Sequence, residues 1–175
     1  MWYSIIFIFS LGALFHFLYE ISGHNKIVAL FAAVNESTWE HIKMALSATF
    51  IYSLYDGFVY GSYSNYFPAK TLSILTIIFF IIIVFYTYTS FTKKPILVLD
   101  ILLFFFSIYF AQKLFYFIIS LNPFEYTFQY ISVVLLFIIF GSYMTLTLLP
   151  LENIIFQDPI TKKYGIIRYR KKYKN

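Results

Sequence analysis

Long apolar runs, separated by short polar segments, divide this chain into five predicted membrane-spanning helices. The runs lie at about residues 2–19, 37–61, 71–89, 96–119 and 128–149. A bilayer core roughly 30 Å thick needs about 20 mainly apolar residues of α-helix, so each run is close to the required length. The pattern therefore predicts an all-α, polytopic membrane protein with five transmembrane helices.

The organisation around these runs is simple. We expect a single transmembrane helical domain over residues 1–158 and a short basic tail over residues 159–175. The first run lacks both the basic start and the small-residue cleavage site of a signal peptide, so we expect it to be retained as a span.

The connection between the first and second spans has a pattern of its own. Residues Ile27–Val34 form an apolar octet that is too short to cross a bilayer, which predicts an interfacial or re-entrant segment. Ser37 is followed three residues later by Glu40. This is the capping-box spacing, and it predicts that the second helix begins here.

Two helix faces are polar enough that we expect them to point into the bundle. At 100° per residue, Gly12, His16, Glu20 and Gly23 fall on one narrow stripe of the first helix. The second span carries small and polar residues on the face that includes His41, namely Ala45, Ala48, Thr49, Tyr52 and Asp56.

The composition supports a membrane location and narrows the chemistry. The chain of 175 residues is 61% hydrophobic and 12% charged, and its mean hydropathy is +0.76. This is more apolar surface than a soluble domain of this length buries. The absence of cysteine excludes disulfides, thiolate metal sites and thiol nucleophiles. Any metal ligand must therefore be His, Asp or Glu.

The basic residues predict the orientation. Seven Lys and Arg residues lie among the last fourteen positions, which places the C-terminus in the cytoplasm and, with five spans, the N-terminus outside. Lys70 is then an outward cation, and Lys113 lies within the fourth span. We expect a multi-pass protein of the cell membrane that contacts the bilayer and, through its basic tail, anionic lipids. We expect no nucleic-acid partner.

The run from His16 to Lys43 is the richest polar segment, and it lies at the predicted cytoplasmic end of the bundle. It holds all three histidines and three of the eight acidic residues. His16 and Glu20, at positions i and i+4, can present two ligands on one face, and His41 can complete a set suited to zinc or another divalent metal. In the alternative interpretation, His16 and Glu20 pair with each other and Glu40 caps its own helix.

A second hypothesis is chemistry on a small polar ligand or a lipid head group at the same end. Glu40 or His41 would act as general base, and a membrane substrate would be turned over. The expected ligand contacts are Asn35, Glu36, Trp39, Lys43, Asp100 and Asp158. For Glu20, Glu36 and Lys43, which lie near helix ends, a solvated position is the simpler interpretation.

A transporter or channel component is the alternative function. Its route would use the ionisable residues predicted within or near the spans, namely His16, Glu20, Asp56, Asp100 and Lys113. Asp56 and Lys113 can pair in the outer half of the bundle, or Lys113 can extend outward along its own helix. Five spans lack the inverted repeat of many carriers, so this function would require a homo-oligomer or a membrane partner.

Three sequence blocks together resemble an uncharacterised family of small bacterial multi-pass membrane proteins. They are HFLYEISG at His16–Gly23, AVNESTWEHIKM at Ala33–Met44 and DPITKKYGI at Asp158–Ile166. The resemblance implies an integral protein of a bacterial inner membrane without an assigned activity, so no catalytic role follows from it. It directs attention to His16, Glu20, Asn35, Glu36, Trp39, Glu40, His41 and Asp158.

Overall fold

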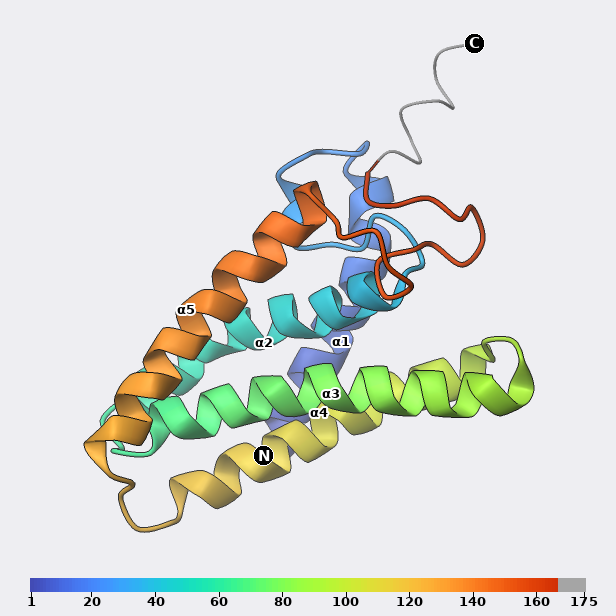
Figure 1. Cartoon of the computed structure of the whole chain (residues 1–175). Coiled ribbons are helices and arrows are strands. Elements are labelled where there is room, and N and C mark those ends of the chain that lie inside the picture. The colour runs from blue at the N-terminus through green and yellow to red at the C-terminus, as the bar shows by residue number, and fades with distance from the viewer. Residues whose placement is uncertain (167–175) are drawn as a thin grey trace.

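A computed structural model describes residues 1–166, and the named elements in this range are all helical (Figure 1). They are α1 (Trp2–Ile21), the 3-10 turn η1 (Val28–Leu30), α2 (Thr38–Tyr60), α3 (Tyr66–Thr92), α4 (Leu97–Ile119) and α5 (Tyr126–Leu148). The all-α prediction is confirmed for the described residues. Most of the predicted basic tail, residues 167–175, lies outside them.

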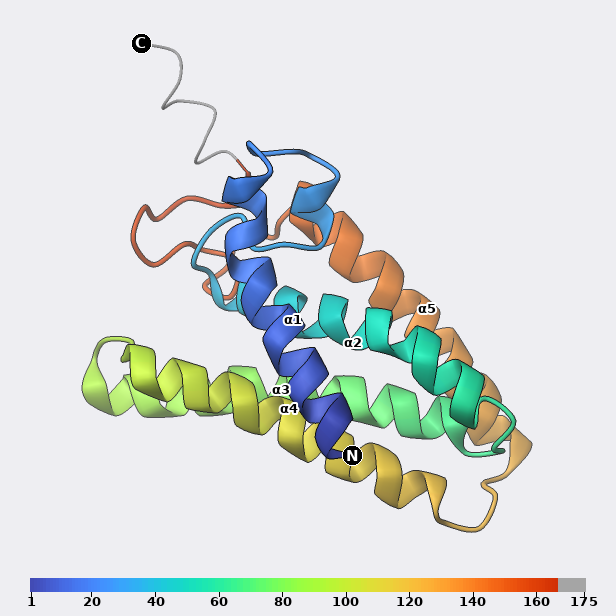
Figure 2. The same cartoon turned by 180° about the vertical axis from the view of Figure 1, so that it is seen from behind.

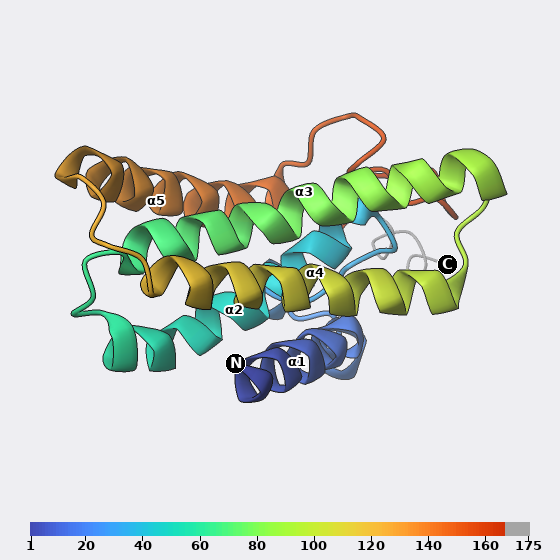
Figure 3. The same ribbon diagram turned by 90° about the horizontal axis from the view of Figure 1, so that it is seen from below.

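The helices pack around a hairpin formed by α3 and α4. These two helices make the most extensive contact in the molecule, and α1 packs against both α2 and α4. Figure 2 shows α1 crossing the hairpin, and Figure 3 shows α5 beside α3, with α1 at the opposite edge. The C-terminal ends of α1 and α5 and the start of α2 lie at one end of the bundle, beside the segment that follows α5 (Figure 1).

Four helices, α1, α3, α4 and α5, are long and apolar enough to cross a membrane. With 23 residues, α2 also has a sufficient length, but its charged side chains make it less apolar. Every residue from Ile42 to Thr49 is buried, so this part of α2 is enclosed by protein. The count of five spans depends on α2 and stays a prediction.

The predicted inward face of α2 is confirmed. Ala45, Ala48, Thr49 and Asp56 are fully buried. The stripe on α1 is confirmed only in part, because Gly12 is buried while Glu20 is exposed. A Cβ at Gly12 would lie 2.7 Å from Cζ of Phe104, so a larger residue here would displace the Phe104 ring.

Of the two alternatives for Lys113, the pairing with Asp56 is wrong. Oδ2 of Asp56 lies 2.5 Å from Nζ of Lys70 on α3, and both side chains are buried. The same ammonium group lies 4.3 Å from the ring centroid of Phe115. Lys113 is exposed on α4, with its Nζ 5.6 Å from the ring centroid of Tyr109. Lys70 therefore belongs to the interior and not to an outer loop, because its charge is neutralised there by Asp56.

Candidate metal centre

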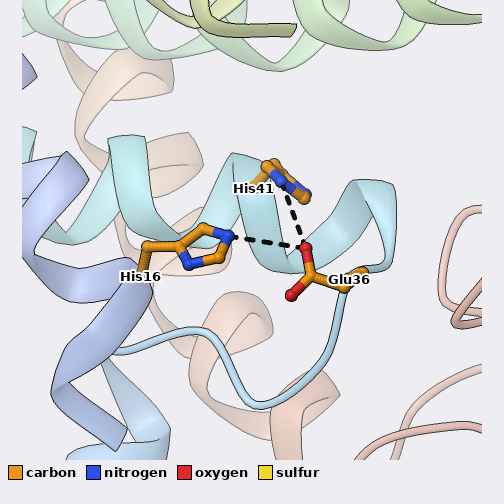
Figure 4. A group of neighbouring side chains, drawn as sticks. All are labelled: His16, Glu36 and His41. Atoms are coloured by element: carbon orange, nitrogen blue, oxygen red, sulfur yellow. Dashed lines mark ion pairs between the residues drawn. The ribbon is translucent and has the colours of Figure 1, made fainter. Parts of the chain in front are cut away.

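Three potential metal ligands from separate parts of the chain converge at the end of the bundle where α2 begins. Figure 4 shows His16 on α1, His41 on the first turn of α2, and Glu36 on the loop that precedes α2. Glu36 Oε2 lies 3.4 Å from Nε2 of His16 and 4.0 Å from Nε2 of His41. One ligand atom from each of the three residues lies within 4.8 Å of the other two.

The loop that carries Glu36 is held by its neighbours. Asn35 accepts a hydrogen bond from the backbone N–H of Ser37 (2.8 Å), and its side-chain amide donates to the carbonyl of Gly165 (3.3 Å). Ser37 is the N-cap of α2 and accepts from the N–H of Glu40 (3.4 Å), as the capping pattern predicts. Glu36 is thus fixed between two tethered residues and directed toward the histidines.

The ring of His41 is oriented by the backbone of its own helix. Its Nδ1 lies 2.9 Å from the carbonyl oxygen of Ser37. Because a carbonyl only accepts, Nδ1 carries the proton, and in the neutral ring Nε2 keeps its lone pair. That lone pair and the Glu36 carboxylate lie on the same side of the cluster. Such an arrangement is stabilised by a proton or a metal cation between them, and it matches the outer-shell support typical of ligating histidines.

The three residues line one part of a cavity of about 540 Å³. Thr38 and Asp100 add further polar groups, and Asp100 accepts a hydrogen bond from the hydroxyl of Tyr88. The remaining walls are apolar and come from α3, α4, the turn between them and the segment after α5, namely Ile81, Phe85, Pro95, Leu97, Leu103, Phe104, Pro159 and Ile160.

Glu40 and Lys43 form a buried ion pair and do not line this cavity. Lys43 Nζ lies 2.6 Å from Oε2 of Glu40 and also donates to the carbonyl of Ala29 (2.8 Å). Glu40 Oε2 accepts from the backbone N–H of Val34 (2.9 Å). The solvated position expected for Lys43 is therefore wrong, because two acceptors compensate its charge in the interior. The general-base role of Glu40 stays a prediction, and the structure gives its carboxylate a different set of partners.

Trp39 contacts the segment that follows α5, and Asp158 belongs to that segment. The ring centroids of Trp39 and Phe156 lie 4.8 Å apart. The backbone N–H of Trp39 donates to the carbonyl of Ile155 (2.9 Å). Asp158 is buried and accepts from the backbone N–H groups of Ile160 and Thr161. These contacts place Pro159 and Ile160 beside the cavity. Ligand contact by Trp39 or Asp158 stays a prediction.

Glu20 lies near the cluster but outside the group of three. It lines a smaller pocket of about 100 Å³, whose wall also includes His16, Asn35 and Glu36. The rings of His16 and His41 lie 5.8 Å apart, centroid to centroid, with Glu36 between them. Metal ligation by His16, Glu20 and His41 stays a prediction. Glu36 was expected as a ligand contact and not as a metal ligand, and the structure places it on the loop before α2.

The sequence did not predict the apolar walls of the cavity, nor the hydroxyl groups of Thr38, Tyr86 and Tyr88. Thr38 lies 3.2 Å from the hydroxyl of Tyr86, and Tyr88 contacts Asp100. Thr38 sits within the polar run and could have been proposed. Phe85, Leu97 and Phe104 lie in apolar runs where the sequence does not distinguish a cavity wall from a lipid-facing side chain.

The chain belongs to a family of unknown function, DUF6512, whose model matches residues 1–166. Comparisons with curated proteins and with solved structures give no match. Membership of an uncharacterised family agrees with the resemblance seen in the sequence.

Proposed function

We propose that this member of the DUF6512 family binds a divalent metal ion, with zinc the best match, through His16, Glu36 and His41. The observation that carries the proposal is the convergence of these three donors within 4.8 Å from α1, a loop and α2. Two histidines and one glutamate form a known type of zinc site that leaves a fourth position for water or substrate. That position would face the cavity.

The two distances to Glu36 fit this ion with small adjustments. Tetrahedral zinc with bonds of about 2.0–2.2 Å requires ligand atoms roughly 3.3–3.5 Å apart. The His16 to Glu36 distance of 3.4 Å meets this requirement. The His41 to Glu36 distance is 4.0 Å, so His41 would have to approach Glu36 by about half an ångström, a shift within the range of side-chain motion.

The surroundings support a functional site. His16 comes from the first of the three sequence blocks, and Glu36 and His41 come from the second. Pro159 and Ile160, from the third, line the same cavity. A metal ion with an open position can activate water or polarise a carbonyl oxygen, which would allow turnover of a membrane substrate.

The orientation and location form part of the proposal. With α2 as the fifth span, the site lies at the cytoplasmic end of a multi-pass protein in a bacterial inner membrane. The basic tail would contact anionic lipids there.

The test is elemental analysis of detergent-purified protein by plasma mass spectrometry. We expect about one zinc or other transition-metal ion per chain, and loss of most of it in His16→Ala, Glu36→Gln and His41→Ala, since each removes one of three ligands. His24→Asn is the matched control. It removes the third imidazole, and asparagine tolerates the positive φ of 64° at this position.

Two outcomes would overturn the proposal. One is wild-type protein without bound metal even after incubation with zinc and desalting. The other is metal content that falls equally in His24→Asn and in the three cluster variants. Size-exclusion profiles of all variants would show that the fold is retained.

The transport function is the second candidate, and the interior of the other half of the bundle favours it. Asp56 and Lys70 are a buried ion pair, yet Oδ1 of Asp56 has no hydrogen-bond partner among the described residues. Ser73 and Gln112 are also fully buried. Their side-chain polar atoms have no hydrogen-bond partner within residues 1–166. Buried polar groups of this kind mark ion or proton pathways in membrane proteins. If the wild-type protein binds no metal, transport becomes the favoured function.

A further inference from the structure

The cavity beside the candidate metal centre is amphipathic. Its polar groups are the three proposed ligands with Thr38 and Asp100, and the rest of its wall is hydrocarbon or aromatic. A small hydrated ligand would use only the polar groups and would leave the apolar wall in contact with water. The distribution of polar and apolar residues along the wall therefore favours a ligand that has one polar and one apolar part.

The volume limits the size of that ligand. Cavities of roughly 300–1,000 Å³ enclose small organic molecules, and this one is about 540 Å³. Such a space suits one chain better than the whole of a two-chain phospholipid. The apolar wall is formed by α3, α4 and Ile160 of the segment after α5, so a chain would lie between the hairpin and the C-terminal segment.

The polar groups define the head group. The two histidines, Glu36 and Asp100 together carry no net positive charge, so an anionic group alone is not favoured there. A bound divalent cation would add positive charge to the site and would attract an oxygen ligand. The open coordination position of the cation suits a carboxylate, ester or amide oxygen.

We infer that the cavity binds a single-chain amphiphile with a carbonyl-bearing head group. The head group lies at His16, Glu36 and His41, and the chain lies along Phe85, Leu97 and Leu103. The placement of the head group rests on the proposed metal site, whereas the placement of the chain rests on the cavity alone.

The test is photo-cross-linking in phosphatidylcholine vesicles. A palmitic acid analogue with a mid-chain diazirine is added in trace amounts, and the labelled peptides are identified by mass spectrometry. We expect labels on peptides that contain Phe85, Leu97 or Leu103. Excess unlabelled palmitic acid should remove them, and removal of metal with a chelator should weaken them.

Two neighbouring positions on α4 give a matched pair of variants. Both side chains are exposed, Leu97 at 74% and Val98 at 64%, but Leu97 lies at the rim of the cavity and Val98 does not line it. Leu97→Trp should reduce cavity labelling about tenfold by filling the space, and Val98→Trp should leave it unchanged. Leu103→Trp, deeper in the cavity, is a second blocking variant. Size-exclusion profiles provide the check on folding, because they do not depend on metal binding.

Labels spread evenly over the outer helix faces, or equal cavity labelling in Leu97→Trp and Val98→Trp, would overturn the inference. Retained metal with no cavity labelling would contradict amphiphile binding in the cavity, while metal binding would still be supported. Cavity labelling in protein that never binds metal would contradict the metal site and retain the amphiphile.

Discussion

At the scale of single residues, the pairing of Glu36 with two imidazoles gives the site its chemistry. The carboxylate oxygen lies 3.4 Å and 4.0 Å from the two Nε2 atoms. The backbone carbonyl of Ser37 holds the proton of His41 on Nδ1, which leaves Nε2 for a ligand. A glutamate shared by two imidazoles, one of them held in this tautomer, is better suited to hold a cation than to abstract a proton alone.

At the scale of elements, the buried pair Glu40–Lys43 joins the segment between α1 and α2 to the start of α2. Lys43 donates to the carbonyl of Ala29, and Glu40 accepts from the N–H of Val34. Both ends of the apolar segment are therefore fixed to α2, and the loop carrying Glu36 follows directly.

We predict that Lys43→Met lowers the free energy of unfolding by about 3–5 kcal/mol, because it leaves the Glu40 carboxylate buried without a counter-charge. The double variant Glu40→Gln/Lys43→Met should recover most of this loss. The measurement is unfolding in mixed micelles followed by circular dichroism.

Lys113→Met is the control, since it makes the same change at an exposed lysine of α4 and should alter the free energy of unfolding by less than about 0.5 kcal/mol. If Lys43→Met proved no more harmful than Lys113→Met, the pair would have no structural role of the kind described.

Helical periodicity predicted the elements and several buried faces well. The inward stripe of α2 followed from the spacing of Ala45, Ala48 and Thr49, since regular helix geometry alone fixes which residues share a face. The same reasoning could not place Glu36, whose position depends on hydrogen bonds of Asn35 and Ser37 within a loop. Nor could it pair Asp56 with Lys70, which lies on another helix. Contacts between elements depend on packing that periodicity does not encode.

At the scale of the whole molecule, the alternating direction of the helices places the loops at two ends. The connection after α1 and the turn between α3 and α4 belong to one end, and the connections α2–α3 and α4–α5 belong to the other. If α2 spans the membrane, these two sets of loops lie on opposite sides.

The absence of cysteine allows this to be tested with single cysteines. We predict that a membrane-impermeant maleimide labels Ser62→Cys and Asn122→Cys in intact bacterial cells, and labels Lys26→Cys and Lys94→Cys only after the membrane is opened. All four positions are exposed in the structure. Labelling of Lys26→Cys and Ser62→Cys from the same side would exclude α2 as a span.

The central claim is that His16, Glu36 and His41 hold one metal ion. X-ray absorption at the zinc edge of zinc-loaded protein tests it most directly, since imidazole rings give a recognisable scattering pattern. The predicted shell contains two imidazoles and oxygen ligands in wild type, and one imidazole in His41→Ala. A wild-type shell without imidazole, or one unchanged in His41→Ala, would contradict the account.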